Sequence, residues 1–195
     1  MSVHRCAWAN PKNPLYVAYH DDEWGVPSFD DDHLFEMLIL EGCQAGLSWE
    51  TILNKREGYR RAYDGFDPER MAGWSDAKLE ELRGDAGIVR NRLKIKAART
   101  NAQAFLKVVE DYASFADYIW KFVDGRPVQN NFKTIGDIPA KTDVSDAMSK
   151  DLKKRGFTFV GSTICYAYMQ SVGMVNDHET RCWRHAECRA QAMNP

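Results

Sequence analysis

Residues 150–163 combine positive charge, glycine and hydroxyl groups at a spacing suited to holding a phosphate. Lysines and an arginine end one helical pattern, GFTFVG follows at 156–161, and Ser162 opens the next helix. Gly156 and Gly161 let the backbone turn sharply and come close to a partner, and amides at a helix N-terminus favour a phosphate. A helix-hairpin-helix over about 145–174 that grips one DNA phosphate fits this pattern. An ordinary turn between two helices with a solvated basic end fits it equally well.

Glu41 is an acidic residue on an otherwise apolar helical stripe. At roughly 100° per residue it lies near Leu34 around the helix axis and one turn beyond Met37 and Leu38. A buried carboxylate needs a partner, so this position would mark a site. If the helix instead ends near Gly42, Glu41 reaches water, and the pattern leaves both interpretations open.

Aromatic residues crowd the N-terminal quarter of the chain. Trp8, Tyr16, Tyr19 and Trp24 lie within 17 residues, and Trp49 follows the break at residues 46–48. Most such rings belong to a core. A cluster of electron-rich rings beside an acidic residue also suits a pocket for a flat cationic ring, through stacking and cation–π attraction.

Cysteine and histidine residues near the two ends of the chain could hold a metal ion. His178 and Cys182 are four residues apart and can face one point on a helical turn, and Cys6 with His20 would complete a tetrahedral Cys₂His₂ site. A local quartet competes with this set, namely His178, Cys182, His185 and Cys188. Neither set has a standard zinc-finger spacing, so unrelated polar residues are a third interpretation.

Helical signals recur along the chain and strand signals do not, so the sequence predicts an all-α protein of about eight helices in a single domain over 1–195. Capping residues and apolar repeats mark helices that begin near residues 31, 49, 68, 114, 145 and 162, with a short one through Leu79 and Leu82 and a longer one whose apolar residues run in register from Ile95 to Val109. Residues 125–142 form the long irregular connection, which we interpret as a surface loop or a weak domain boundary.

Composition limits the classes of protein to consider. The 195 residues carry 26 Lys and Arg against 28 Asp and Glu, which excludes a protein that coats nucleic acid by bulk charge. A local basic face remains possible, and we place it at 150–155 together with Arg90, Arg92 and Lys94. No apolar run approaches the roughly 20 residues of a membrane span, and five scattered cysteines argue against a disulfide framework. We expect a soluble, cytoplasmic monomer that contacts no membrane.

Several long segments, taken together, resemble the 3-methyladenine DNA glycosylase I family of the helix-hairpin-helix superfamily. The matching segments are RCAW at 5–8, PLYVAYHDDEWGVP at 14–27, LFEMLILEGCQAGLSW at 34–49, FDP at 66–68, DAGIVRNRLKI at 85–95 and KKRGFTFVGSTICYAYMQSVGMVNDH at 153–178. The resemblance implies an enzyme that flips 3-methyladenine out of alkylated double-stranded DNA and cuts its N-glycosidic bond with water, leaving an abasic site. Methylation makes the base cationic, so it is already a good leaving group.

The resemblance also implies roles for individual residues. Glu41 and Tyr19 are similar to the residues that hydrogen-bond the base, and Trp49 to the residue that stacks on it. The remaining pocket-lining rings would be Trp8, Tyr16 and Trp24. On the DNA side, Leu47 after Gly46 resembles the wedge that fills the gap in the duplex. The backbone from Gly156 to Gly161, with Ser162, would hold the phosphate.

The same resemblance favours Cys6, His20, His178 and Cys182 as the ligands of a structural zinc ion, which leaves His185 and Cys188 outside the site. Four protein ligands close the coordination sphere, so the ion would tie the N-terminal segment to the C-terminal one.

Two departures from the wider superfamily bear on the chemistry. Many of its members place a catalytic Asp after the second hairpin helix, where this chain has Asn176 beside Asp177, and we assign Asp177 no catalytic role. No lysine is specified for Schiff-base chemistry, so strand cleavage is not expected. Two other hypotheses stay open, a zinc-stabilised module that binds damaged DNA without chemistry and a zinc hydrolase with an open coordination position.

Overall fold

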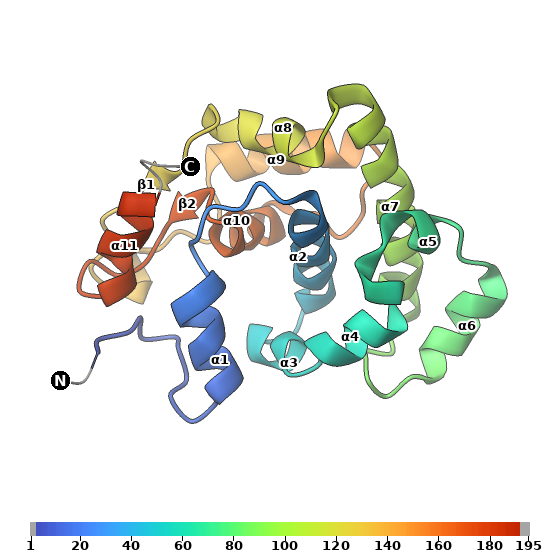
Figure 1. Cartoon of the computed structure of the whole chain (residues 1–195), viewed down its shortest axis with the longest axis horizontal. Helices are drawn as coiled ribbons and strands as arrows, with labels where there is room; N and C mark the ends of the chain where they lie inside the picture. The colour runs from blue at the N-terminus through green and yellow to red at the C-terminus, as the bar shows by residue number, and fades with distance from the viewer. Residues whose placement is uncertain (1–2, 192–195) are drawn as a thin grey trace.

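The computed structural model describes residues 3–191, which are mostly helical (Figure 1). The helices are α1 (Pro14–Ala18), α2 (Asp31–Gln44), α3 (Trp49–Leu53), α4 (Arg56–Ala62), α5 (Pro68–Ala72), α6 (Asp76–Gly84), α7 (Arg92–Tyr112), α8 (Phe115–Trp120), α9 (Asp143–Lys154), α10 (Ser162–Ser171) and α11 (Trp183–Gln191). Two short strands, β1 (Val128–Gln129) and β2 (Val175–Asn176), pair in parallel.

Side-chain caps fix the start of several helices, as the sequence predicts. The Asp30 carboxylate accepts from the first amides of α2, and Asp67 does the same for α5, whose first residue is Pro68. Ser48 and Ser114 cap α3 and α8. A short polar side chain satisfies amides that the first turn of a helix leaves without partners, so these residues set the boundaries.

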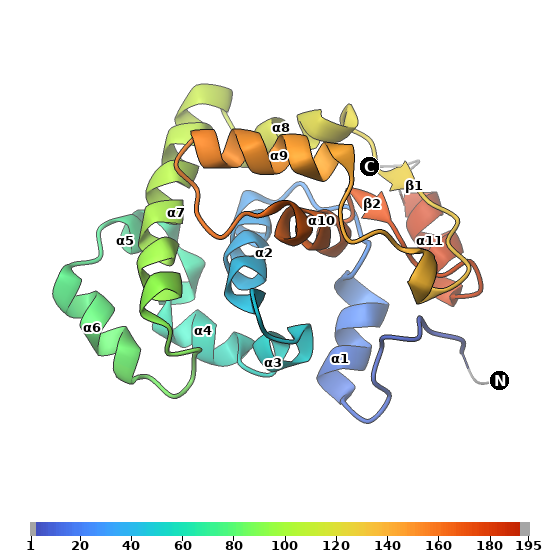
Figure 2. The same ribbon diagram turned by 180° about the vertical axis from the view of Figure 1, so that it is seen from behind.

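Helix α2 is the centre of the fold. Each residue from Leu34 to Cys43 is buried, and α3, α7, α8 and α10 all contact this helix. Figures 1 and 2 show it enclosed between α7 on one side and α10 on the other. A helix that is apolar on nearly every side must lie inside a protein. Polar side chains between Leu34 and Cys43 are therefore held in a rigid and mostly dry environment.

The N-terminal segment lies beside the start of α11. Trp183 at the start of α11 donates its backbone amide to the carbonyl of His4, and Figures 1 and 2 both show the N-terminal segment beside α11. The long loop between α8 and α9 runs past the same region, where the amide of Val128 bonds the carbonyl of Met174.

The predicted number of helices and the expected absence of strands are both wrong. Residues 3–191 contain eleven α-helices instead of about eight, because the single helix predicted to begin near residue 49 is split into α3 and α4, and because α1 and α11 give weak signals. The split places Arg56 inside, where it binds Glu23 and Glu36, and this tertiary contact outweighs local continuity. Strands were not expected, yet β1 forms inside the irregular connection because β2 supplies its backbone partners.

None of the helices in residues 3–191 has the length and apolar character required to span a bilayer.

Candidate active site and metal centre

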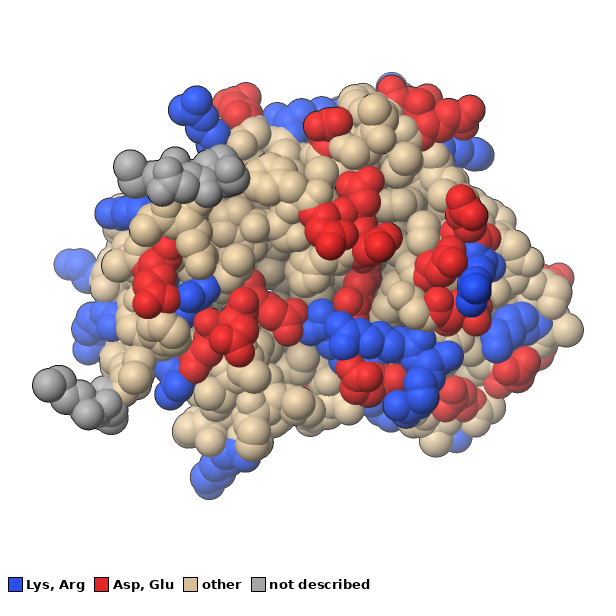
Figure 3. Space-filling model, in the orientation of Figure 1, with Lys and Arg blue, Asp and Glu red and all other residues tan. Residues whose placement is uncertain are grey.

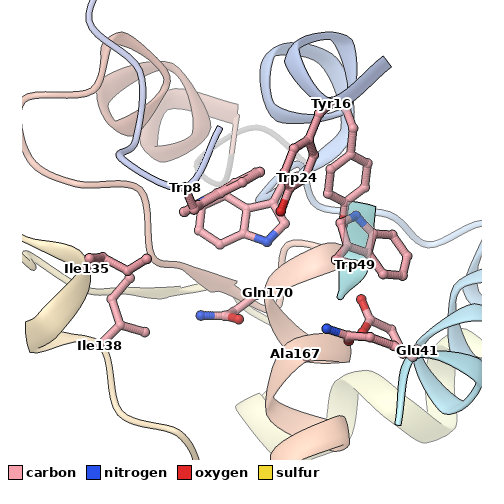
Figure 4. A pocket seen from close by; sticks show the side chains of 11 residues that line it. Trp8, Tyr16, Trp24, Glu41, Trp49, Ile135, Ile138, Ala167 and Gln170 are labelled. Carbon is pink, nitrogen blue, oxygen red and sulfur yellow. The ribbon is translucent and has the colours of Figure 1, made fainter. Parts of the chain in front are cut away.

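A cavity of about 270 Å³ opens between α2, α10 and the N-terminal segment (Figure 4). All six residues that the sequence analysis assigns to a base pocket line it, namely Trp8, Tyr16, Tyr19, Trp24, Glu41 and Trp49. They come from three separate parts of the chain, so their convergence is a result of the fold. The cavity is of the right order for a flat ring ligand.

Aromatic rings form most of the cavity wall. The Trp8 ring lies edge-on to Trp24 at 4.9 Å and tilted against Tyr16 at 5.2 Å, and Tyr19 lies 5.2 Å from Trp49. Tyr19 and Trp49 are buried, while Tyr16 is half-buried at the rim. Interlocked rings of this kind are rigid and present π-faces to the cavity, which is an arrangement that attracts cations and stacks on bases.

Glu41 is the acidic group of the cavity and is only 3% exposed. Its Oε2 atom is buried without a hydrogen-bond partner among residues 3–191. Burial raises the pKa of Glu41 to about 8, with the Ser171 hydroxyl opposing the shift. Burial, and then the charge of Glu41, also raise the pKa of Tyr19, which keeps its phenol a donor. Because Glu41 is buried and α2 continues past it to Gln44, the alternative that Glu41 reaches water is wrong.

Five further residues line the cavity that the sequence analysis did not identify, namely Gln44, Ile135, Ile138, Ala167 and Gln170. Gln44 lies three residues after Glu41, so the helical period could have identified it. Ala167 and Gln170 share one face of α10 for the same reason. Nothing in the sequence marks Ile135 and Ile138, because they come from the irregular connection before α9.

The turn after α2 carries Leu47, which is exposed. Gly46 has a positive φ of 77°, a conformation that glycine adopts without strain. The side chain of Lys94 on α7 holds this turn, because its Nζ donates to the carbonyls of Cys43 and Ala45 at 2.7 Å each. The prediction that Lys94 belongs to a basic surface is therefore wrong, since these carbonyls at the end of α2 draw the ammonium inside.

The turn between α9 and α10 is held by a second residue of α7. Asn101 is buried; its Nδ2 donates to the carbonyl of Thr158, and the amide of Thr158 donates back to its Oδ1. Gly156 has φ 96°, and a Cβ at Gly161 would meet no protein atom within 4 Å, so the backbone there faces open space. Ser162, the first residue of α10, hydrogen-bonds Ser145 of α9 through its hydroxyl at 2.8 Å.

Exposed positive charge is limited around this hairpin. Lys150, Lys153 and Lys154 are exposed, whereas Arg155 binds Asp111 and Asp151 and is partly neutralised. On the face drawn in Figure 3, acidic side chains gather near the middle above a band of Lys and Arg, so charge of both signs is mixed there. This matches the net charge of −2.

Cys6, His20, His178 and Cys182 form a buried cluster whose ligand atoms all lie within 4.8 Å of one another. Cys182 Sγ is 3.5 Å from His20 Nε2 and from His178 Nδ1. The opposite ring nitrogens contact Asp21 Oδ1 at 2.7 Å and the Trp24 carbonyl at 2.9 Å, an orientation common in metal-binding histidines. Hydrogen bonds from Cys6 and the two histidines lower the pKa of the Cys182 thiol and favour its thiolate. The cluster could therefore bind a metal ion.

The competing local quartet does not form. His185 hydrogen-bonds the carbonyl of Asn130 through Nε2, and Cys188 lies outside the cluster that could hold a metal. Asn176 and Asp177 are also fully engaged. The Asn176 amide donates to Gln129 and to the carbonyl of His185, and the Asp177 carboxylate accepts three hydrogen bonds.

Comparison with known proteins gives consistent matches over most of the chain. The sequence model of a family described as methyladenine glycosylase matches residues 8–185. The chain is 51% identical over 180 residues to DNA-3-methyladenine glycosylase 1 of Escherichia coli, covering 92% of this chain and 96% of that protein. It is 46% identical to DNA-3-methyladenine glycosylase of Haemophilus influenzae, covering 91% and 96%.

Solved structures resemble the fold equally well. A crystal structure of 3-methyladenine DNA glycosylase I superposes with a TM-score of 0.90 at 52% identity, covering 92% of this chain and 98% of that one. A variant of such a glycosylase in complex with 3-methyladenine superposes with a TM-score of 0.89 at 35% identity, covering 92% and 96%.

Proposed function

The chain belongs to the methyladenine glycosylase family, more narrowly to the 3-methyladenine DNA glycosylase I family, and from this premise we propose that it removes 3-methyladenine from alkylated double-stranded DNA. It is an enzyme, a hydrolase acting on N-glycosyl bonds. The observation that carries the proposed substrate is Glu41, a carboxyl group buried in an aromatic cavity with one oxygen that no residue of the described chain satisfies.

Glu41 would select the lesion by its charge and its hydrogen bonds. A buried carboxyl group with a raised pKa gains little from a neutral ligand, but a cationic base restores the interactions that it lost on leaving water. Trp49 would stack on the base and the phenol of Tyr19 would hydrogen-bond it, while Trp8, Tyr16 and Trp24 complete the walls. Unmodified adenine is neutral and would bind less tightly, and its glycosidic bond is much harder to break.

The hydrolysis itself asks little of the protein. As the glycosidic bond breaks, its electron pair moves onto the cationic base, which leaves neutral, and positive charge develops on the sugar. Water then adds to the anomeric carbon and releases a proton. The cationic base would favour the ionised form of Glu41, and this carboxylate and the π-faces of the cavity would stabilise the positive charge. Asp177 is saturated by three donors in the fold, which supports a mechanism without a superfamily-type Asp.

Access to the base requires flipping it from the duplex. Leu47 projects from a turn that Lys94 fixes, and it would fill the space left by the flipped nucleotide at an unstacking cost of a few kcal/mol. The open backbone at Gly161, together with the first amides of α10, would hold a phosphate in the manner of a helix-hairpin-helix. The chain would act as a monomer in which residues 1–195 form one domain.

Zinc fits the Cys₂His₂ set, because four thiolate and imidazole ligands in a tetrahedral arrangement are usual for structural zinc. Bound by Cys6, His20, His178 and Cys182, it would supply a cross-link between the two ends of the chain and no catalytic chemistry. Two cavity residues contact these ligands, because the Trp8 ring packs against His20 and the Trp24 carbonyl hydrogen-bonds His178, so the ion would also stabilise the cavity wall.

The test is to incubate the purified protein with methylated double-stranded DNA and to measure released bases by chromatography. We expect free 3-methyladenine and abasic sites, with no strand breaks until alkali is added. Binding of abasic DNA without any base release would instead show a damage-binding module. Breaks formed without alkali would contradict the monofunctional reaction.

A further inference from the structure

Gln170 and Asp177 form a hydrogen-bonded pair beside the cavity that the proposed reaction does not use. Asp177 is 1% exposed, and its carboxylate accepts from Gln170 Nε2 at 2.8 Å, from the Tyr166 hydroxyl at 2.6 Å and from Asn130 Nδ2 at 2.7 Å. Gln170 and Tyr166 lie one turn apart on α10, and Asn130 follows β1. These three hydrogen bonds fix the carboxylate of Asp177, which therefore requires no further hydrogen-bond donor.

This pairing decides which end of the Gln170 amide faces the cavity. Nε2 is held by the carboxylate, and a flipped amide would place its oxygen against Asp177 Oδ2, where two acceptors repel. The Oε1 atom has no hydrogen-bond partner among residues 3–191. Gln170 lines the cavity from α10, and Figure 4 shows it projecting into the same space as Glu41 from α2. The cavity therefore presents a second acceptor.

We propose that Gln170 contacts the flipped base, its carboxamide oxygen accepting a hydrogen bond from the exocyclic amine of 3-methyladenine, and that Asp177 is the positioning residue that fixes this orientation. The inference rests on the proposed function. It makes Gln170 a specificity residue that favours bases carrying an amine over bases carrying a carbonyl at that position.

The physical reason is the cost of an unsatisfied or repelled acceptor. A base derived from guanine presents a carbonyl oxygen where adenine presents its amine, so Gln170 Oε1 would face another acceptor. Gln170 cannot turn to offer its nitrogen without leaving the buried Asp177 carboxylate short of a donor. The hydrogen bond between Gln170 and Asp177 therefore makes the protein discriminate against bases that carry a carbonyl at this position, although Asp177 itself lies outside the cavity.

The first experiment replaces Gln170 with Met, which keeps the length of the side chain and removes the acceptor. Binding of free 3-methyladenine and of free 3-methylguanine is titrated by tryptophan fluorescence in wild type and in Gln170→Met. We expect 3-methyladenine to bind about tenfold more weakly, equivalent to ~1.4 kcal/mol, and 3-methylguanine to bind more tightly, because the acceptor that faces its carbonyl is gone. An equal change for both bases, or none for either, would overturn the proposal.

The second experiment tests the positioning role with Asp177→Asn, since an Asn can face either end of the Gln170 amide. We expect the preference for 3-methyladenine to fall several-fold. The matched control is Tyr166→Phe, which removes another donor to the same oxygen and leaves the Gln170 contact in place, so the preference is retained. Equal losses in the two variants would reduce Asp177 to a structural role and contradict the inference. A wild-type protein that releases no 3-methyladenine would refute the proposed function itself.

Discussion

Replacing Glu41 with Gln should stabilise the protein while impairing its recognition of the base. The pKa of Glu41 is raised from 4.5 to about 8 by burial. A carboxyl group whose folded-state pKa is raised costs nothing below its unfolded pKa, and its cost grows with pH until the folded pKa is reached. Each pH unit in this window corresponds to about 1.4 kcal/mol. At pH 7 the ionisable group therefore destabilises the fold by about 3 kcal/mol, and glutamine does not titrate.

Urea unfolding of wild type and Glu41→Gln between pH 5 and pH 8, at one zinc concentration, measures this effect. The difference in unfolding free energy should widen by about 3 kcal/mol over the range, in favour of the variant. Glu110→Gln is the matched control, because it makes the same substitution at an exposed position on α7, and an equal widening in this variant would show that the effect does not come from burial. A pH-independent difference for Glu41→Gln would refute the assignment of a buried, unsatisfied carboxyl group.

Three further predictions concern the elements around the cavity. Lys94→Met removes the donors that hold the Leu47 turn, so base release from double-stranded methylated DNA should fall about tenfold while release from single strands changes little. Lys96→Met, at an exposed position of the same helix, is the control. An equal loss on both substrates would contradict the proposal that Lys94 positions Leu47 as a wedge. Cys6→Ala should abolish stoichiometric zinc and lower the urea midpoint, whereas Cys188→Ala should keep the metal; plasma mass spectrometry that finds zinc in the first variant would reject the cluster. Few exposed cations flank the hairpin, so the protein should neutralise only a few phosphates. A plot of the logarithm of DNA affinity against the logarithm of salt concentration should have a slope of about −3, at roughly −0.9 per phosphate. A slope near −9 would require a more extensive basic surface than the one we assign.

The sequence predicted the central helix correctly because it depends on local periodicity, which placed Glu41 on the apolar stripe but left its burial open. Asp30 caps α2, the apolar stripe buries it, and Glu41 lies where the helical period places it. The six cavity residues were found by motif, and their convergence follows from the way that the N-terminal segment packs on α2 and α10. Periodicity gives no information about such long-range packing, which is why the alternatives for the metal ligands stayed open before the resemblance was considered.

What the sequence could not predict depends on contacts between distant residues. Lys94 follows a helical cap among other basic residues, and only the end of α2 makes it an internal donor. Ile135 and Ile138 reach the cavity from a connection without periodicity. Gln170 lies in a segment that matches the family, but the orientation of its amide depends on a hydrogen bond to Asp177 that its own position in the sequence does not predict.

Three acidic residues that are buried in this fold differ in their hydrogen bonding, and the difference supports the proposed site. Glu36 is buried and bound by the guanidinium groups of Arg56 and Arg60, and Asp177 is buried and accepts three hydrogen bonds. Glu41 is buried to a similar extent, yet one of its oxygens has no partner within residues 3–191. Because the fold satisfies Glu36 and Asp177 fully, Glu41 is the exception among these three buried acids. An unsatisfied carboxyl group at the bottom of an open aromatic cavity is a cost that a donor-rich cation would offset on binding.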